Sequence, residues 1–158
     1  MRLSYRTALP AGMSGMLALE RAVHDSSLEP LLLELVKMRA SQINGCAHCL
    51  DMHSKDARAL GEDEQRLHLL AAWREAPGYS ERERAALAWC ESLTRLADTG
   101  APDSDYEPLT GLFSGEEIAA LTFAIVAING WNRLAVGLRA PVGGYVSPHA
   151  GAARDGAG

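Results

Sequence analysis

Apolar residues recur at spacings of three and four along nearly the whole chain, and this pattern most restricts the possible folds. No segment shows the alternation of apolar and polar residues that a half-buried strand needs. The sequence therefore predicts a single compact all-α domain of six to eight helices. The stretches with helical periodicity are residues 12–23, 28–43, 46–60, 63–73, 80–96, 106–113 and 114–138.

The length and composition fit one globular domain. The chain has 158 residues and is 47% hydrophobic, so it can bury a core without a metal or a disulfide. Glycine, alanine, proline and histidine dominate from residue 140 onward. We expect a helical domain over residues 1–139 and a C-terminal arm over residues 140–158 that lies on the surface or frays.

The charge and the apolar runs exclude several functional classes. The net charge is −5, and the basic residues are interleaved with acidic ones, which disfavours nucleic-acid binding. The N-terminal residues do not form a secretory signal, and the longest apolar run, residues 118–128, is too short to cross a membrane. We therefore expect a cytoplasmic protein, in which three cysteines do not form a structural disulfide framework.

A pair of cysteines directly follows a helix break at Asn44-Gly45. Cys46 and Cys49 then fall in the first turn of the next helix, where free N–H groups and the helix dipole stabilise a thiolate. His53 follows Cys49 by four residues, so the three side chains share a sector of roughly 60° on that helix. His53 can act as a base toward a sulfur, whereas His48 projects to roughly the opposite side.

Glu34 and Cys90 are two further polar or reactive residues that lie within apolar stretches of the sequence. Glu34 lies in an apolar run, either as the exposed edge of an amphipathic helix or as a carboxylate that the Asn44-Gly45 turn brings against His53. In the second arrangement it would orient His53 and hold its proton. Cys90 lies on an apolar helical stripe, so we expect a buried packing residue that stays reduced.

The cysteine pair leaves other functions open. Cys46, Cys49 and His53 supply three of the four ligands of a zinc site, with Glu34 or His48 as a fourth, and such a chain would be a zinc-binding assembly module. A disulfide reductase or a redox sensor would use the same pair without specific peroxide chemistry. Metal analysis and peroxide turnover with a dithiol donor distinguish these functions.

The spacing of these residues resembles a known superfamily. Glu34, eleven residues, Cys46-x-x-Cys49, three residues and His53 are similar to the alkylhydroperoxidase D and carboxymuconolactone decarboxylase-like proteins. His48 between the cysteines also matches many hydroperoxidase members. The resemblance extends over residues 10–138, and the segments 73–77, 80–89 and 127–134 resemble the smaller single-domain members.

The resemblance implies an all-helical fold and the reduction of hydrogen peroxide or organic hydroperoxides. It implies that Cys49 reacts with the peroxide, that Cys46 resolves the product to a disulfide, and that Glu34, His53 and His48 form a proton relay. Decarboxylase members lack the cysteine pair, which argues against that activity here. No metal, flavin or nucleotide cofactor is required, and the electron donor is a dithiol of unknown identity.

The resemblance also implies a homo-oligomer, either a trimer or a hexamer. The last predicted helix agrees with this, because it is apolar on nearly every side: one face can pack in the monomer, and the remaining faces need cover.

Overall fold

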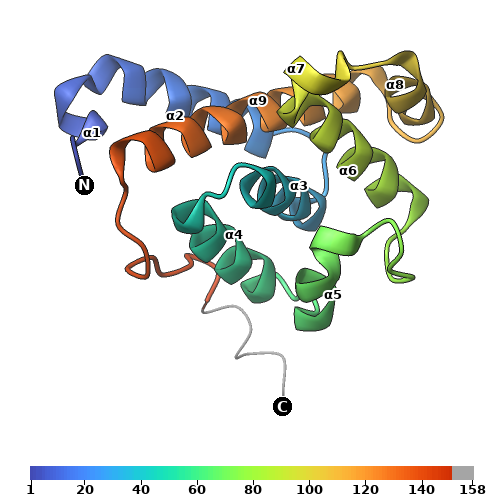
Figure 1. The fold of residues 1–158 in the computed structure, drawn as a ribbon, viewed down its shortest axis with the longest axis horizontal. Coiled ribbons are helices and arrows are strands. Elements are labelled where there is room, and N and C mark those ends of the chain that lie inside the picture. The colour runs from blue at the N-terminus through green and yellow to red at the C-terminus, as the bar shows by residue number, and fades with distance from the viewer. Residues whose placement is uncertain (151–158) are drawn as a thin grey trace.

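The computed structural model describes residues 1–150, which form helices joined by short connections (Figure 1). These residues contain no strand, so the all-α prediction is confirmed. The helices are α1 (Tyr5–Ala8), α2 (Pro10–His24), α3 (Pro30–Ile43), α4 (Ala47–Ala59), α5 (Glu64–Leu69) with a 3₁₀ turn at Leu70–Ala72, α6 (Glu81–Thr94), α7 (Leu96–Thr99), α8 (Asp103–Thr110) and α9 (Gly115–Leu138).

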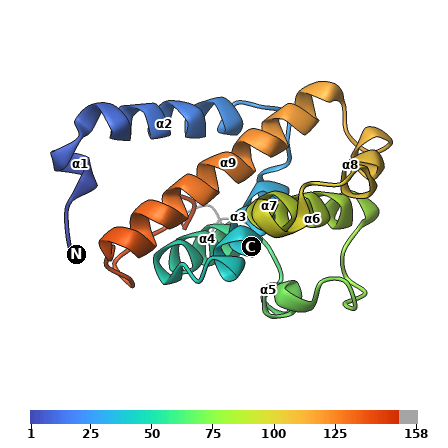
Figure 2. The same cartoon turned by 45° about the horizontal axis from the view of Figure 1, so that its top comes forward.

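Helix α3 is the centre of the packing, because it contacts α4, α6 and α9. Helix α2 packs on α9 from the other side, so that α9 lies between α2 and the α3–α4 pair (Figure 2). The larger core cluster draws most of its buried residues from α3, α4, α6 and α9, and it includes both Cys46 and Cys49. The cysteine pair is therefore part of the main core.

Two helices begin with the capping boxes that the sequence contains. Ser80 caps α6 together with Glu83, and Ser114 caps α9 together with Glu117. In each box the serine hydroxyl accepts a backbone N–H of the first turn, while the glutamate accepts the N–H of the serine. Both helix starts were predicted correctly.

The segment before α9 differs from the prediction. No helix was predicted between residues 96 and 106, but α7 ends at Thr99 and α8 begins at Asp103, one turn before the predicted start. Asp103 and Asp105 lie in the first turn of α8, where acidic side chains interact favourably with the helix dipole. The short helices α1 and α7 were not predicted.

Within the described residues, only α9 is long and apolar enough to cross a membrane. It is longer than the apolar run of residues 118–128 because the helix continues past the polar residues that follow that run. α9 packs against α2, α3, α4 and α6, which is the environment of a core helix.

The C-terminal arm leaves α9 at Arg139 and runs alongside α4 (Figure 1). The imidazole of His48 donates to the carbonyl of Pro141 at 2.6 Å, and the N–H of Gly143 donates to Asp51 at 3.2 Å. The sequence left open whether this arm lies on the surface or frays. Residues 140–147 lie on the surface, bonded to α4. Residues 151–158 lie outside the described part of the chain.

Candidate active site

The turn between α3 and α4 positions the cysteines. Gly45 has a φ of +64°, a left-handed conformation that glycine adopts without strain. Asn44 fastens the turn by donating from its amide to the Oδ1 atom of Asn132 at 2.8 Å. The N–H of Cys46 bonds to the carbonyl of Ser41 at 2.9 Å, and Cys46 becomes the N-cap of α4.

Cys46 and Cys49 are reduced, buried and unequal. The sulfur of Cys46 accepts the backbone N–H of Cys49 at 3.3 Å. Hydrogen bonds from the thiol and the backbone of Cys49 lower the pKa of Cys46 to about 6, although burial opposes the shift. The pKa of Cys49 is raised because its thiol donates to Cys46 and because it is buried. Near neutral pH the pair therefore holds one proton, on Cys49, and one negative charge, on Cys46.

Asn132 of α9 lies against both sulfurs, and the sequence analysis missed it. Its side chain is 1% exposed and donates to the hydroxyl of Ser41 at 3.0 Å. Hydrogen bonding to the Asn132 amide lowers the pKa of Cys46 and opposes the rise in the pKa of Cys49. A polar amide inside the most apolar helix was the available signal, because a buried amide needs partners.

Glu34 and His53 form a buried hydrogen-bonded pair between α3 and α4. The Nδ1 atom of His53 lies 2.8 Å from Oε2 of Glu34, and the residues are only 5% and 9% exposed. The contact proposed from the sequence is therefore present, and Glu34 is not a solvated helix edge. When Nδ1–H donates to the carboxylate, the neutral ring keeps Nε2 unprotonated, able to accept a proton.

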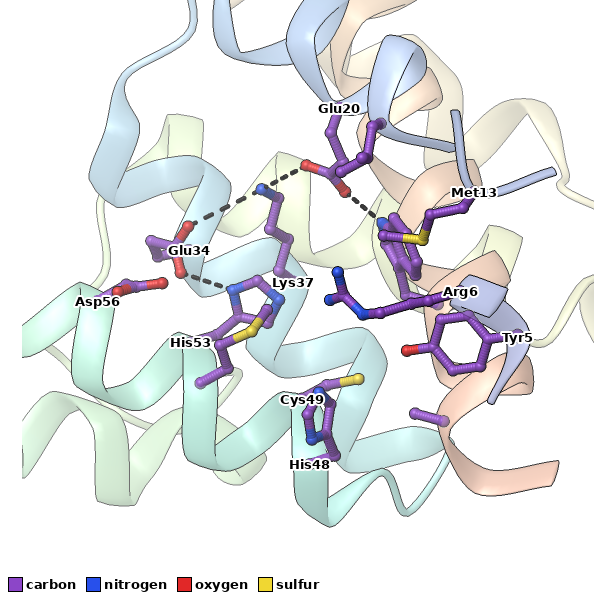
Figure 3. Close-up of a pocket in the computed structure, with 14 residues that line it drawn as sticks. Tyr5, Arg6, Met13, Glu20, Glu34, Lys37, His48, Cys49, His53 and Asp56 are labelled. Atoms are coloured by element: carbon purple, nitrogen blue, oxygen red, sulfur yellow. Dashed lines mark hydrogen bonds and ion pairs between the residues drawn. The ribbon is translucent and has the colours of Figure 1, made fainter. Parts of the chain in front are cut away.

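A cavity of about 250 Å³ adjoins this pair, and Cys49 lines it together with His53 and Glu34 (Figure 3). The apolar part of the remaining lining comes from α2, α4 and α9 and includes Met13, Leu17, Met52, Trp131 and Ala135. Cys46 lines a different hollow, which also contains Arg2 and Arg139. His48 is half-buried and borders both spaces, with its Nδ1 atom engaged by the C-terminal arm.

Asp56 is a second residue that the sequence analysis did not select. It is 9% exposed, and its carboxylate lies within 4.8 Å of the ligand atoms of both Glu34 and His53. These three side chains could hold a metal ion, but Glu34 and His53 are already bonded to each other. Within residues 1–150 neither cysteine belongs to such a ligand group.

Cys90 lies where the sequence predicted, and Asp51 lies outside the relay. Asp51 points away from His53 and forms an ion pair with Lys55 at 2.8 Å. Cys90 is fully buried and its thiol donates to the carbonyl of Val36 at 3.3 Å. Burial raises the pKa of Cys90 to about 12, so this thiol is a packing residue.

Residues 9–92, which include the whole constellation from Glu34 to His53, match the model of the carboxymuconolactone decarboxylase family. The chain belongs to this family. A relative in Bacillus subtilis, the uncharacterized protein YdfG, is 40% identical over 137 residues, which are 87% of this chain and 93% of that protein.

Solved structures place the chain among the AhpD-like members of the carboxymuconolactone decarboxylase family. A protein of unknown function from Agrobacterium tumefaciens, suggested to be an antioxidant defence protein AhpD, is 48% identical with a TM-score of 0.87. The match covers 91% of this chain and 99% of that one. The debrominase Bmp8 shares the fold at 18% identity, with a TM-score of 0.76 over 85% of this chain and 73% of its own. The family and its fold thus include enzymes, with more than one activity.

Proposed function

We propose that the protein is a thiol-dependent peroxidase that reduces hydrogen peroxide or organic hydroperoxides through the Cys46–Cys49 pair. The observation that carries the proposal is the buried hydrogen bond between His53 and Glu34 beside the cavity that Cys49 lines. A thiol and a base whose tautomer is set by a carboxylate thereby line one cavity. The AhpD-like suggestion for the Agrobacterium relative supports the same activity.

The first chemical step uses His53 as the base for Cys49. Nε2 accepts the thiol proton, and the carboxylate of Glu34 stabilises the resulting imidazolium through Nδ1. The Cys49 thiolate attacks the peroxide, so that an S–O bond forms and the O–O bond breaks. The leaving alkoxide takes the proton from His53, which yields an alcohol and a sulfenic acid on Cys49.

The second step uses Cys46 as the resolving thiol. In its thiolate form Cys46 attacks the sulfenic sulfur of Cys49, so that the S–S bond forms and the S–O bond breaks. The displaced hydroxide leaves as water after taking up a proton, and a disulfide remains. A dithiol donor then reduces the disulfide by exchange, which returns both thiols and produces an oxidised donor. Such a cycle needs a reducing compartment, so we propose the cytoplasm as its location.

The test measures peroxide consumption with dithiothreitol or dihydrolipoamide as the donor. Wild type and Cys90→Ala should turn over, whereas Cys46→Ser and Cys49→Ser should lose at least about 10²-fold in rate. Cys90→Ala is the matched control because Cys90 is a thiol outside the site. Wild-type consumption no faster than the donor alone would contradict the proposal, as would full activity of Cys49→Ser.

A disulfide reductase or a redox sensor remains the alternative that uses the same residues. Reduction of a model disulfide by wild type, without peroxide turnover, would identify a reductase. Because a debrominase has the same fold, peroxide turnover must be measured directly.

A further inference from the structure

The C-terminal arm reaches the proton relay through Tyr145. The ammonium of Lys55 donates to the carbonyl of Tyr145 at 3.0 Å, which holds this part of the arm against α4. The phenol of Tyr145 then donates to the carboxylate of Asp56, with its oxygen 2.9 Å from both carboxylate oxygens. A residue 92 positions beyond His53 in the sequence is thus one side chain away from it.

Asp56 lies on the same face of α4 as the proposed catalytic residues. Cys49, His53 and Asp56 are separated by four and three residues, so they lie one above another on the same helix face. The carboxylate of Asp56 faces Glu34 and the imidazole of His53, with ligand atoms within 4.8 Å (Figure 3). Its place on α4 therefore aims a negative charge at the ring that accepts the thiol proton.

The other charges around His53 determine how strongly the Asp56 carboxylate can interact with a protonated imidazole. The other charged or titratable groups that line the cavity are Tyr5 and Arg6 from α1, Glu20 from α2, Glu34 and Lys37 from α3, and His48 and Cys49 from α4. Lys37 lies 3.1 Å from Glu20 and 3.9 Å from Glu34, so it is shared by two carboxylates. A buried carboxylate is costly without a nearby countercharge, and protonated His53 supplies one to Asp56.

Tyr145 is suited to hold Asp56 rather than to exchange its proton. Burial, together with the hydrogen bond and the charge of Asp56, raises the pKa of the Tyr145 phenol. The hydroxyl therefore remains a donor throughout the range in which thiols titrate. It fixes the orientation of Asp56 and partly compensates its charge.

We propose that Asp56 and Tyr145 are positioning residues of the relay: Asp56 stabilises the imidazolium that His53 forms when it takes the Cys49 proton, and Tyr145 holds Asp56. The use of that proton rests on the proposed peroxidase function, but its acceptance by His53 does not. The C-terminal arm then belongs to the active centre instead of merely covering it.

The test measures the thiolate of Cys49 by ultraviolet absorbance as a function of pH in a Cys46→Ser background, where Cys49 is the only thiol at the centre. Adding Asp56→Asn should raise the pH midpoint by about one unit, which is a tenfold loss of thiolate at a fixed pH. Adding Tyr145→Phe should shift the midpoint in the same direction by less. The single-turnover rate with peroxide, in otherwise wild-type protein, should fall about tenfold for Asp56→Asn.

Two matched controls separate positioning from damage to the fold. Asp103→Asn removes the charge of an exposed carboxylate on α8, and Tyr106→Phe removes a phenol hydroxyl on the same helix. Neither should move the midpoint. An unchanged midpoint in Asp56→Asn overturns the role of Asp56, and an unchanged midpoint in Tyr145→Phe overturns that of Tyr145, whatever their thermal stability. A shifted midpoint in a protein that does not reduce peroxide would support the relay while refuting the proposed function.

Discussion

At the scale of single residues, the two thiols of the centre differ because one caps a helix and the other lies inside it. Cys46 accepts hydrogen bonds from Cys49, and the hydrogen-bond donor Cys49 keeps the shared proton. Cys49 lines the cavity with His53, whereas Cys46 does not. This division fits a reactive sulfur that needs an external base and a resolving sulfur outside the cavity.

The pH dependence of the pair follows from these shifts. The pKa of Cys46 is lowered to about 6, so the pair consists of two thiols below that pH and gains one thiolate as the pH rises through it. We expect the thiolate absorbance of reduced protein to rise near pH 6. Cys49→Ala removes the thiol donor, so its midpoint should lie higher. A wild-type midpoint near about 8.5, the value of a free thiol, would contradict this account.

The role of Glu34 can be tested by an isosteric change. Glu34→Gln keeps a partner for the Nδ1–H of His53 but removes the charge that stabilises the imidazolium. We expect the fold and the disulfide to persist while peroxide reduction slows by roughly 10²-fold. Asp51→Asn is the control, because Asp51 pairs with Lys55 and points away from His53. Near wild-type turnover of Glu34→Gln would show that the relay is wrong.

Some site residues could be predicted from the sequence and others could not. Cys46, Cys49 and His53 lie on one helix, so their spacing alone brings them together. Glu34 required knowledge of how α3 packs on α4, which the family spacing supplied. Asn132 and Tyr145 join the site from segments more than 80 residues away, and no local pattern encodes such contacts.

At the scale of elements, the turn between α3 and α4 decides where the sulfurs point. Gly45 takes a left-handed conformation that would strain an L-residue, and an added Cβ would meet no atom within 4 Å. The cost of a substitution there is therefore one of backbone conformation alone.

Gly45→Ala should lower the free energy of unfolding by about 1–2 kcal/mol. Gly45→Asn should cost less, because asparagine tolerates the left-handed region better than alanine. Denaturant unfolding of the two variants beside wild type measures both values. Equal free energies of unfolding for wild type, Gly45→Ala and Gly45→Asn would show that a side chain at this position does not strain the backbone of the turn.

At the scale of the whole molecule, the helical class could be predicted because the apolar periodicity is strong and the capping boxes mark two helix starts. The packing of the C-terminal arm could not, since its residues carry no periodic signal and are held by individual hydrogen bonds to α4. Large apolar side chains are exposed on the surface of the single chain, among them Leu17, Phe123 and Val126. These exposed side chains support the proposed homo-oligomer. Phe123 and Val126 are more than half exposed on α9, a helix that otherwise forms the core. We expect sedimentation to show a trimer or a hexamer, and we expect Phe123→Glu to shift the protein toward smaller species. Gln65→Glu, which adds the same charge at an exposed position on α5, should not. A wild-type monomer at all concentrations would refute the assembly.

The central claim is that Cys49 is oxidised by peroxide and that Cys46 resolves it. The most direct measurement mixes fully reduced protein with one equivalent of peroxide, without donor, and follows the products by mass spectrometry. Wild type should lose two of its three thiols to a Cys46–Cys49 disulfide, while Cys90 stays reduced. Cys46→Ser should accumulate a sulfenic acid on Cys49. Three unchanged thiols in wild type, or a sulfenic acid on Cys46 in Cys49→Ser formed as fast as the wild-type disulfide, would contradict the account.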